Sequence, residues 1–212
     1  MTQEVDIWVD PMCPWAWMTA QWMLQVEQVR DVKARFNIMS LSYLNEGREG
    51  LSDDYRKMME NGWGPVRIAL AVEQEGGKDA LREYYLKLAT LRHNKKRGFS
   101  SSSYKEALAR AGMSPDLADR ANDAGLDQAV KASHHAGMDP VGDEVGTPVI
   151  HFPGQDGGSR AYFGPVITPP PTGEEAGLLW DGLLAMAQVE GFYELKRSRS
   201  TEPEFLHMPD YD

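Results

Sequence analysis

Residues 10–16, with the sequence DPMCPWA, contain the only cysteine of the 212-residue chain. An alternating apolar run at residues 5–9 comes before them and predicts a half-buried strand. After them, apolar residues recur every three or four positions, which predicts a helix, and Pro14 suits its first position. Cys13 is therefore expected between a strand and a helix, where the free N–H groups and the positive end of the helix dipole stabilise a thiolate.

Two interpretations of Cys13 compete. A lone cysteine is often a small, buried and inert hydrophobe. A reactive thiol needs more than the helix, because a helix terminus contributes at most about 1 kcal/mol, which is less than one pKa unit. The Pro-Trp pair that follows Cys13 at this junction favours the reactive thiol. We therefore predict a partly exposed thiol with a low pKa, assisted by hydrogen-bond donors from elsewhere in the chain.

The motif Cys13-Pro14-Trp15 after a first strand resembles the active-site turn of DsbA-like thioredoxin-fold proteins. The longer string DPMCPWAW resembles the mycothiol-dependent nitroreductase branch of that family in actinobacteria. The resemblance implies that Cys13 is the catalytic thiol and that Pro14 and Trp15 shape its pocket. Ala16 departs from the usual motif, which has a second, resolving cysteine at this place. With one cysteine, no internal disulfide can form.

The rest of the chain predicts a second strand, then helices only, then two strands and a last helix. The expected segments are a strand at residues 36–44, a turn at 45–48, helices between about 50 and 136 with a stop at Gly76-Gly77, strands at 146–152 and 160–163, and a turn between them at 154–159. The tail from residue 198 is expected to be either an arm on the surface or disordered.

This order of elements resembles the DsbA proteins and the kappa-class glutathione transferases over essentially the whole chain. It implies an α/β protein with a thioredoxin-like fold and an inserted all-helical domain. The expected boundaries are residues 1–44 for the first half of the thioredoxin-like domain, 45–144 for the helical insertion, and 145–212 for the second half with the C-terminal tail.

Thr147 and Pro148 match the cis-proline motif that opens the strand after the insertion in this fold. Only about 5–6% of X-Pro bonds are cis, so the expectation of a cis bond comes from the resemblance. It implies that the backbone of Thr147 pairs with a bound thiol or peptide and that Pro148 packs beside Cys13. The alternative is an ordinary proline at the start of a strand.

Residues 91–97, LRHNKKR, gather cations at the end of a predicted helix. Dipole compensation on a solvated face is the favoured interpretation of the Lys and Arg residues. His93 ends an apolar stripe, and we expect it to reach the site and donate a hydrogen bond to the Cys13 thiolate, with Asn45 as the alternative donor. The family resemblance implies that Asn45, Tyr55 and His93 line the pocket. Asn45 is equally compatible with a turn asparagine that bonds its own backbone.

Composition narrows the classes of partner. The net charge of −10 argues against nucleic acid or an anionic membrane. No apolar run is long enough to span a bilayer and no signal peptide is visible, so a cytoplasmic protein with a reduced thiol is expected. The five histidines lack the spacing of a metal site, and no glycine fingerprint for a nucleotide is present.

The resemblance implies a thiol-dependent oxidoreductase in which Cys13 acts with mycothiol, or another small thiol, as co-substrate. Its substrates would be disulfides or small electrophiles such as nitroaromatics. One alternative is a kappa-class-like transferase or isomerase in which Cys13 only donates a hydrogen bond to a bound thiol. The other is a non-catalytic binding module of the same fold. The sequence leaves the monomer and the homodimer open.

Overall fold

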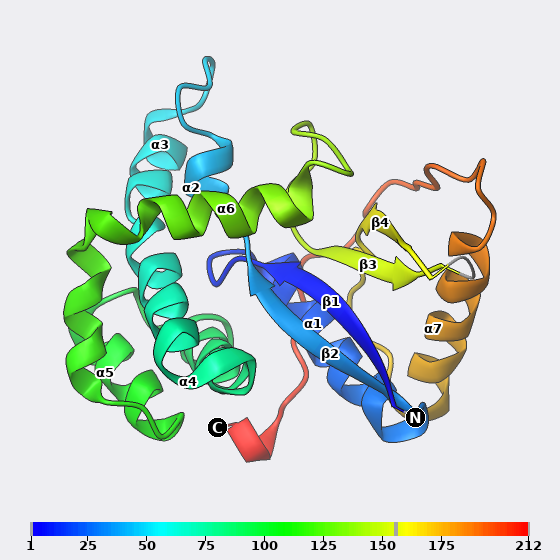
Figure 1. Ribbon diagram of the computed structural model, residues 1–212, viewed down its shortest axis with the longest axis horizontal. Coiled ribbons are helices and arrows are strands. Elements are labelled where there is room, and N and C mark those ends of the chain that lie inside the picture. Colours follow the sequence, from blue (N-terminus) through cyan, green and yellow to red (C-terminus); the bar gives the residue numbers. More distant parts are fainter. Residues whose placement is uncertain (1, 155–156, 212) are drawn as a thin grey trace.

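The computed structural model describes residues 2–154 and 157–211, whose strands form a sheet in the order β2-β1-β3-β4 (Figure 1). β1 (Gln3–Val9) and β2 (Val32–Ile38) run parallel and are joined by the helix α1 (Pro14–Val29). β3 (Val149–Pro153) and β4 (Ser159–Phe163) continue the sheet as antiparallel strands beyond β1. The predicted turn at residues 154–159 lies partly outside the described residues.

One face of the sheet carries the apolar side chains of the alternating pattern. Ile7 in β1 lies opposite Phe36 in β2 and Ile150 in β3, and all three are buried. This face packs against α1 and against α7 (Gly173–Ala187). Trp22 of α1 and Trp180 of α7 meet there with ring centroids 6.3 Å apart. The period of two therefore places the core between the sheet and these two helices.

The opposite face is covered in part by α6 (Asp127–Met138), which crosses the sheet above Trp8 (Figure 1). The indole N–H of Trp8 donates to the carbonyl oxygen of Ser133 at 2.8 Å. Gly137 makes this crossing possible, because a Cβ atom there would lie 2.3–2.4 Å from ring atoms of Trp8. A helix with any larger residue at this position would have to move away from the sheet.

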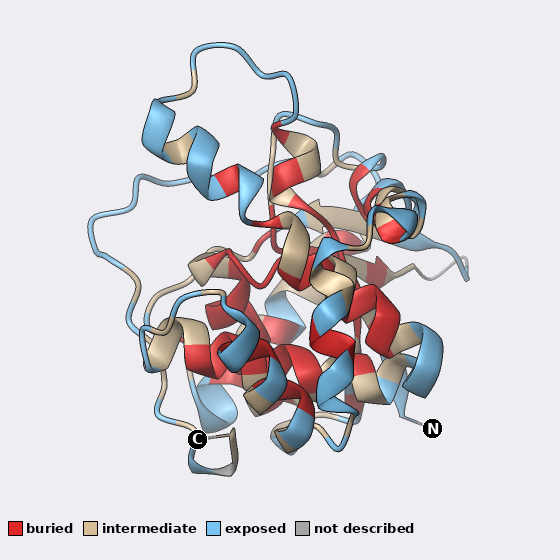
Figure 2. Ribbon diagram, turned by 90° about the vertical axis from the view of Figure 1, so that its left-hand side faces the viewer, coloured by how far each residue is buried: buried red, intermediate tan, exposed pale blue. Residues whose placement is uncertain are grey.

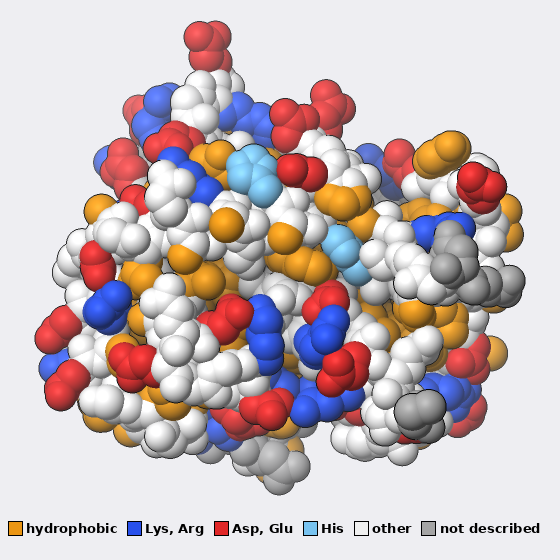
Figure 3. All heavy atoms as spheres, in the orientation of Figure 1, with side chains coloured by type: hydrophobic (Ala, Val, Ile, Leu, Met, Phe, Trp, Pro, Cys, Tyr) orange, Lys and Arg blue, Asp and Glu red, His pale blue; other side chains and the backbone are white. Residues whose placement is uncertain are grey.

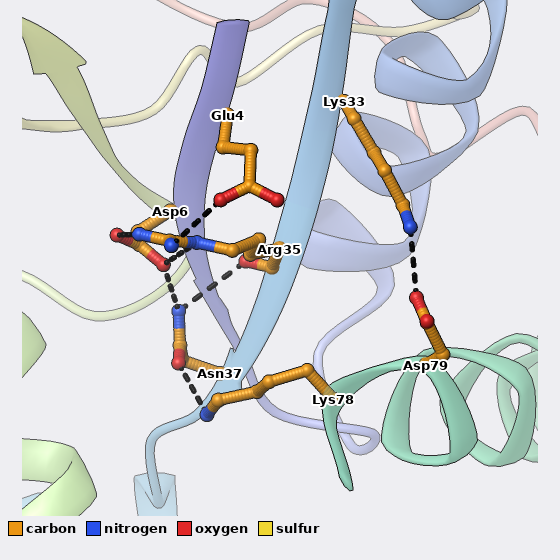
Figure 4. A network of polar contacts seen from close by, with 7 residues as sticks. All are labelled: Glu4, Asp6, Lys33, Arg35, Asn37, Lys78 and Asp79. Atoms are coloured by element: carbon orange, nitrogen blue, oxygen red, sulfur yellow. Dashed lines mark hydrogen bonds and ion pairs between the residues drawn. The ribbon is translucent and has the colours of Figure 1, made fainter. Parts of the chain in front are cut away.

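Beyond α6, this face carries charged side chains over β1 and β2 (Figure 3). Arg35 donates to the carboxylates of Asp6 and Glu4, and Asn37 donates to Asp6 (Figure 4). Lys78, from the insertion, reaches the side-chain oxygen of Asn37 at 2.6 Å. β2 is the edge of the sheet, and such charges disfavour pairing with a further strand.

The segment between β2 and β3, which lies wholly within the described residues, consists of helices joined by loops and contains no strand. Its elements are α2 (Leu41–Leu44), α3 (Asp53–Glu60), α4 (Trp63–Ala89), a π-helical turn η1 (Thr90–Asn94), α5 (Ser101–Arg110), the 3-10 helices η2 (Pro115–Asn122) and η3 (Ala124–Leu126), and α6. Gly77, at φ 76°, interrupts α4 where the glycine pair predicts a stop. Buried residues of α4, η1, α5, η2, η3 and α6 (Figure 2) belong to the same cluster as those of the sheet, so most of the insertion shares one core with the sheet.

The predicted strand at residues 36–44 is wrong in its position. β2 covers residues 32–38, and residues 41–44 form the short helix α2. Ser40 begins this helix, because its hydroxyl oxygen accepts from the backbone N–H of Tyr43 at 3.1 Å. The exposed Lys33 made residues 32–35 look unlike a strand. The serine and tyrosine residues after residue 38 gave a false pattern of alternating apolar and polar side chains. Within the predicted helical segment, residues 115–122 form a 3-10 helix rather than an α-helix.

The segment after α7 is a surface arm, which decides between the two expectations for the tail. The backbone of Leu206 exchanges two hydrogen bonds with the side chain of Gln21 in α1, at 2.9 and 3.1 Å. Its carbonyl oxygen also accepts from the amide of Asn94 at 2.9 Å. Within the described residues, no helix has the length and apolar character needed to cross a membrane.

Candidate active site

Cys13 occupies the junction that the sequence predicts. It is the N-cap residue of α1, and its sulfur accepts a hydrogen bond from the backbone N–H of Ala16 at 3.4 Å. Its S–H group donates to the backbone carbonyl oxygen of Thr147, with 3.3 Å between sulfur and oxygen. The Thr147–Pro148 peptide bond, directly before β3, is cis. Two segments that are 134 residues apart thus meet at the sulfur atom.

The acid–base state of Cys13 differs from the prediction. Burial raises the pKa of the thiol to about 11, and the nearby carboxyl group of Asp10 acts in the same direction. The backbone N–H groups of Ala16 and Trp15 lower the pKa but do not compensate, since Cys13 is only 7% exposed. The predicted low-pKa, partly exposed thiol is therefore wrong for this conformation, because desolvation outweighs the helix terminus.

Asp10 is a site residue that the sequence reasoning missed. It is fully buried, and its carboxylate accepts from the backbone N–H of Met12 at 2.8 Å and of Leu41 at 2.7 Å. These bonds tie the cysteine turn to the start of α2. Burial raises the pKa of Asp10 to about 6. An acidic residue that directly follows an apolar strand and precedes Pro11 was the available signal.

A cavity of about 580 Å³ opens beside Cys13. Its lining brings together several of the predicted residues and adds others: Met12, Cys13, Pro14, Trp15, Leu41, Tyr55, Met58, Met59, Arg92, His93 and Lys96. Arg199, from the surface arm, lies 4.7 Å above the ring of Trp15. Burial raises the pKa of Tyr55, so its hydroxyl group is a neutral donor. The volume suits a small organic molecule.

His93 lines this cavity but does not reach the sulfur. Its Nε2 atom lies 2.9 Å from the carbonyl oxygen of Pro11, so the Nε2–H group donates there. The ring also packs against Phe205 of the surface arm, with centroids 5.6 Å apart. Burial lowers the pKa of His93 to about 4, so the ring is neutral at neutral pH. The predicted donation from His93 to a Cys13 thiolate is absent in this arrangement.

Asn45 lies near the cavity without lining it. Its side-chain amide donates to the carbonyl oxygen of Leu41 at 2.8 Å, and its oxygen accepts from Arg48 at 3.4 Å. These are local bonds of a residue that ends a helix, but the Asn45 side chain also contacts two residues of the lining, the sulfur of Met59 at 3.7 Å and the hydroxyl group of Tyr55. Its role in binding remains a prediction. Thr147 and Pro148 are also outside the cavity lining, and the packing of Pro148 beside Cys13 remains a prediction. Within the described residues, no group of three His, Cys, Asp or Glu side chains is placed to hold a metal ion.

Comparison with solved structures confirms the α/β thioredoxin-like fold with a helical insertion. 2-Hydroxychromene-2-carboxylate isomerase is 13% identical, with a TM-score of 0.59 over 86% of this chain and 95% of that one. The cytosolic disulfide reductase DsbM from Pseudomonas aeruginosa is 14% identical, with a TM-score of 0.56 over 87% and 100%. The probable DsbA oxidoreductase SCO1869 from Streptomyces coelicolor is 14% identical, with a TM-score of 0.53 over 97% and 99%.

Sequence comparison is more specific. The Mycobacterium tuberculosis protein Rv2286c, described as uncharacterized, is 27% identical over 202 residues, which are 92% of this chain and 82% of that protein. The model of the Rv2466c-like family, described as mycothiol-dependent nitroreductase Rv2466c, matches residues 12–197. This match begins at the cysteine turn and includes the whole helical insertion and the Thr147–Pro148 segment. The chain belongs to the Rv2466c-like family of DsbA-like proteins.

Proposed function

We propose that this protein is a thiol-dependent oxidoreductase that uses Cys13 and a small thiol, mycothiol, to reduce disulfides or small electrophiles such as nitroaromatics. One observation carries the proposal. Cys13 caps a helix, faces the carbonyl group of Thr147 across the junction with β3, and borders an open cavity. The family match supports the choice of mycothiol among small thiols.

The chemistry begins from a neutral thiol. A disulfide in the cavity is attacked by the Cys13 sulfur, which forms a new S–S bond as the substrate's S–S bond breaks. The Cys13 proton and the electrons of the broken bond leave with the released thiol. The substrate sulfur then occupies the space beside Thr147, whose backbone oxygen no longer receives the S–H group. A small thiol next attacks the substrate sulfur of the mixed disulfide. A new S–S bond joins these two sulfur atoms as the bond to Cys13 breaks, and the proton of the small thiol returns Cys13 to its thiol form.

We assign the supporting roles by position. Pro14 and Trp15 wall the cavity next to the sulfur, and Tyr55 supplies a hydroxyl donor across it. His93 holds the turn before Cys13 in place by its hydrogen bond to the carbonyl oxygen of Pro11. We assign it a catalytic role because its ring also lines the cavity, where it can contact the substrate. The remaining binding residues lie outside the cavity lining and support it indirectly. They are Asn45 at the end of α2 and Thr147 and Pro148 before β3. We place the reaction in the cytoplasm, because a lone catalytic thiol needs a reducing compartment.

A second candidate function is favoured by the protonated state of the sulfur. With the pKa of Cys13 raised to about 11, the S–H group is a donor at neutral pH. In an isomerase or transferase of the kappa-class kind, it would turn from Thr147 to the thiolate of a bound small thiol. Cys13 would then form no covalent bond to the substrate.

Intact-mass measurement separates the two functions. The protein is incubated with oxidised mycothiol, or with oxidised glutathione, and its mass is recorded before and after a reduced thiol is added. We expect one adduct on Cys13 that the reduced thiol removes, and no adduct on Cys13→Ser. Binding of the reduced thiol without any adduct would favour the second candidate. A protein that neither forms an adduct nor consumes substrate would be a binding module, and the proposal would fail.

A further inference from the structure

The segment that follows α4 has an unusual backbone. Thr90–Asn94 form the π-helical turn η1, and such turns are frequent at functional sites. Lys96, two residues later, has φ 54° and is the sole non-glycine residue with positive φ in the described part of the chain. A left-handed conformation is unfavourable for a residue with a Cβ atom, and glycine would remove the cost. A lysine in this unfavourable conformation points to a functional role for its side chain.

The structure separates the four cations of this segment. Lys95 is exposed and lies outside the cavity lining, and Arg97 pairs with Glu106 of α5. Arg92 and Lys96, by contrast, line the cavity beside Cys13. Arg92 lies 5.1 Å above the ring of Phe99, which orients its guanidinium group. Dipole compensation therefore does not account for these two residues.

The charged residues that line the cavity are all positive in a strongly acidic protein, although the buried carboxyl group of Asp10 acts on Cys13 from outside the lining. The lining contains Arg92 and Lys96 but no aspartate or glutamate, whereas the chain as a whole has a net charge of −10. Most of the other lining side chains are apolar, and Tyr55 and the neutral ring of His93 are its polar groups. The cavity thus combines an apolar wall with two positive charges on one segment.

We propose that Arg92 and Lys96 form an anion-recognition site, and that the disulfide or electrophile substrate of Cys13 has an apolar body with an acidic group such as a carboxylate or sulfonate. This inference rests on the proposed function in one respect, namely that the bound molecule is a substrate. The preference for an anion is a property of the cavity itself. The proposed site would select among disulfides and electrophiles by their charge. The family match gives no information about this preference.

The first test uses two alkylating reagents of similar size on the whole protein. Iodoacetate is an anion and iodoacetamide is neutral, so the ratio of their rates at Cys13 reports local charge and cancels the reactivity of the thiol. Arg92→Gln and Lys96→Gln should each lower this ratio by about two- to fivefold, the effect of a partly exposed charge pair. Lys95→Gln is the matched control and should leave the ratio unchanged.

A second lysine variant guards against misfolding. Lys96→Gly removes the charge and relieves the backbone, so it should lower the ratio while raising the melting temperature. Added salt should lower the ratio of the wild type more than that of the double variant Arg92→Gln/Lys96→Gln. Equal ratios in the wild type and the double variant would overturn the proposal, as would a wild-type Cys13 that neither reagent labels.

Turnover then links the site to the reaction. With a small thiol present, the wild type should consume the anionic disulfide dithiobis(nitrobenzoate) in preference to neutral dithiodipyridine, and the double variant should lose that preference. If neither disulfide is consumed, the proposed function fails, and the labelling ratio still decides the anion site. If both are consumed without any change of preference in the double variant, the function stands and the anion site fails.

Discussion

The S–H group of Cys13 donates a hydrogen bond to the carbonyl oxygen of Thr147, with 3.3 Å between the two atoms. A thiolate cannot donate, so this contact is available only to the protonated form. Burial raises the pKa of the same thiol to about 11. The resting site therefore holds a neutral thiol against the backbone rather than a preformed thiolate.

The first prediction concerns the titration of Cys13. Iodoacetamide labelling against pH should give a midpoint near 11 in the folded protein, because burial is the largest contribution to the pKa. In denaturant the midpoint should return to about 8.5. His93→Ala should leave it nearly unchanged, since His93 donates to Pro11 and not to the sulfur. A folded midpoint below the denatured one would show that an open conformation controls the reactivity.

The same shift affects stability. The folded pKa is raised above the unfolded value, so the contribution is fully present below the unfolded pKa and is lost as pH rises through the folded pKa of about 11. The free energy of unfolding should thus fall by about 3 kcal/mol across that alkaline range. Denaturant unfolding of Cys13→Ala, compared with the wild type at each pH, checks this. A loss of equal size in the variant would assign it to other groups.

Much of the fold could be predicted because its signals are local. Alternation in β1, the proline at the start of α1 and the glycine pair in α4 each act within a few residues. The error at residues 36–44 has a local part, the Ser40 side chain that begins α2, and a tertiary part, the carboxylate of Asp10 that accepts from the N–H of Leu41. The boundaries of the proposed domains, at residues 44–45 and 144–145, remain predictions.

The residues of the site could be named from the sequence, but their acid–base behaviour could not. Cys13, Trp15, Tyr55 and His93 do meet at one cavity. The depth of burial around Cys13 depends on the packing of the whole core. The spacing of residues along the sequence does not show how deeply a side chain is buried. The His93 ring donates its hydrogen bond to the backbone oxygen of Pro11. Because every residue has such an oxygen, the sequence does not reveal this acceptor, and the prediction chose the Cys13 thiolate instead. Their roles in a reaction remain proposals.

The second prediction tests the contact between α6 and the sheet. Gly137→Ala should lower the free energy of unfolding by about 1–3 kcal/mol, because the new methyl group would lie within 2.4 Å of ring atoms of Trp8. Gly182→Ala, on the exposed side of α7 with no atom within 4 Å, is the control. It should stabilise by about 0.5–1 kcal/mol through helix propensity. Chemical denaturation measures both, and equal effects would contradict the close approach.

The third prediction concerns the surface arm. Phe205→Ala should cost about 1–2 kcal/mol, because the half-buried ring packs on His93 with centroids 5.6 Å apart. It should also speed iodoacetamide labelling of Cys13, since the wall of the cavity is loosened. Leu195→Ala, at a side chain that is 80% exposed, should change stability by less than about 0.5 kcal/mol. Unchanged stability and labelling in Phe205→Ala would mean that the arm is detached in solution.

The last prediction addresses the missing second cysteine. Ala16 lies in the first turn of α1, and its backbone N–H already reaches the Cys13 sulfur at 3.4 Å. Ala16→Cys would place a second thiol at the spacing of a Cys-x-x-Cys motif, where low-pKa thiols are common. The position is fully buried, so the larger side chain should cost about 1 kcal/mol or more in stability.

In the wild type, a glutathione adduct on Cys13 should persist until a small thiol is added, because no other cysteine exists in the chain. In Ala16→Cys, the new thiol can attack the Cys13 sulfur, expel glutathione with the proton it loses, and leave an internal disulfide. Intact mass should therefore show rapid loss of the adduct and a final mass two hydrogens below the reduced variant. Ala16→Ser is the matched control and should retain the adduct. Turnover of a disulfide by the wild type without added thiol would contradict the single-cysteine mechanism at its central step.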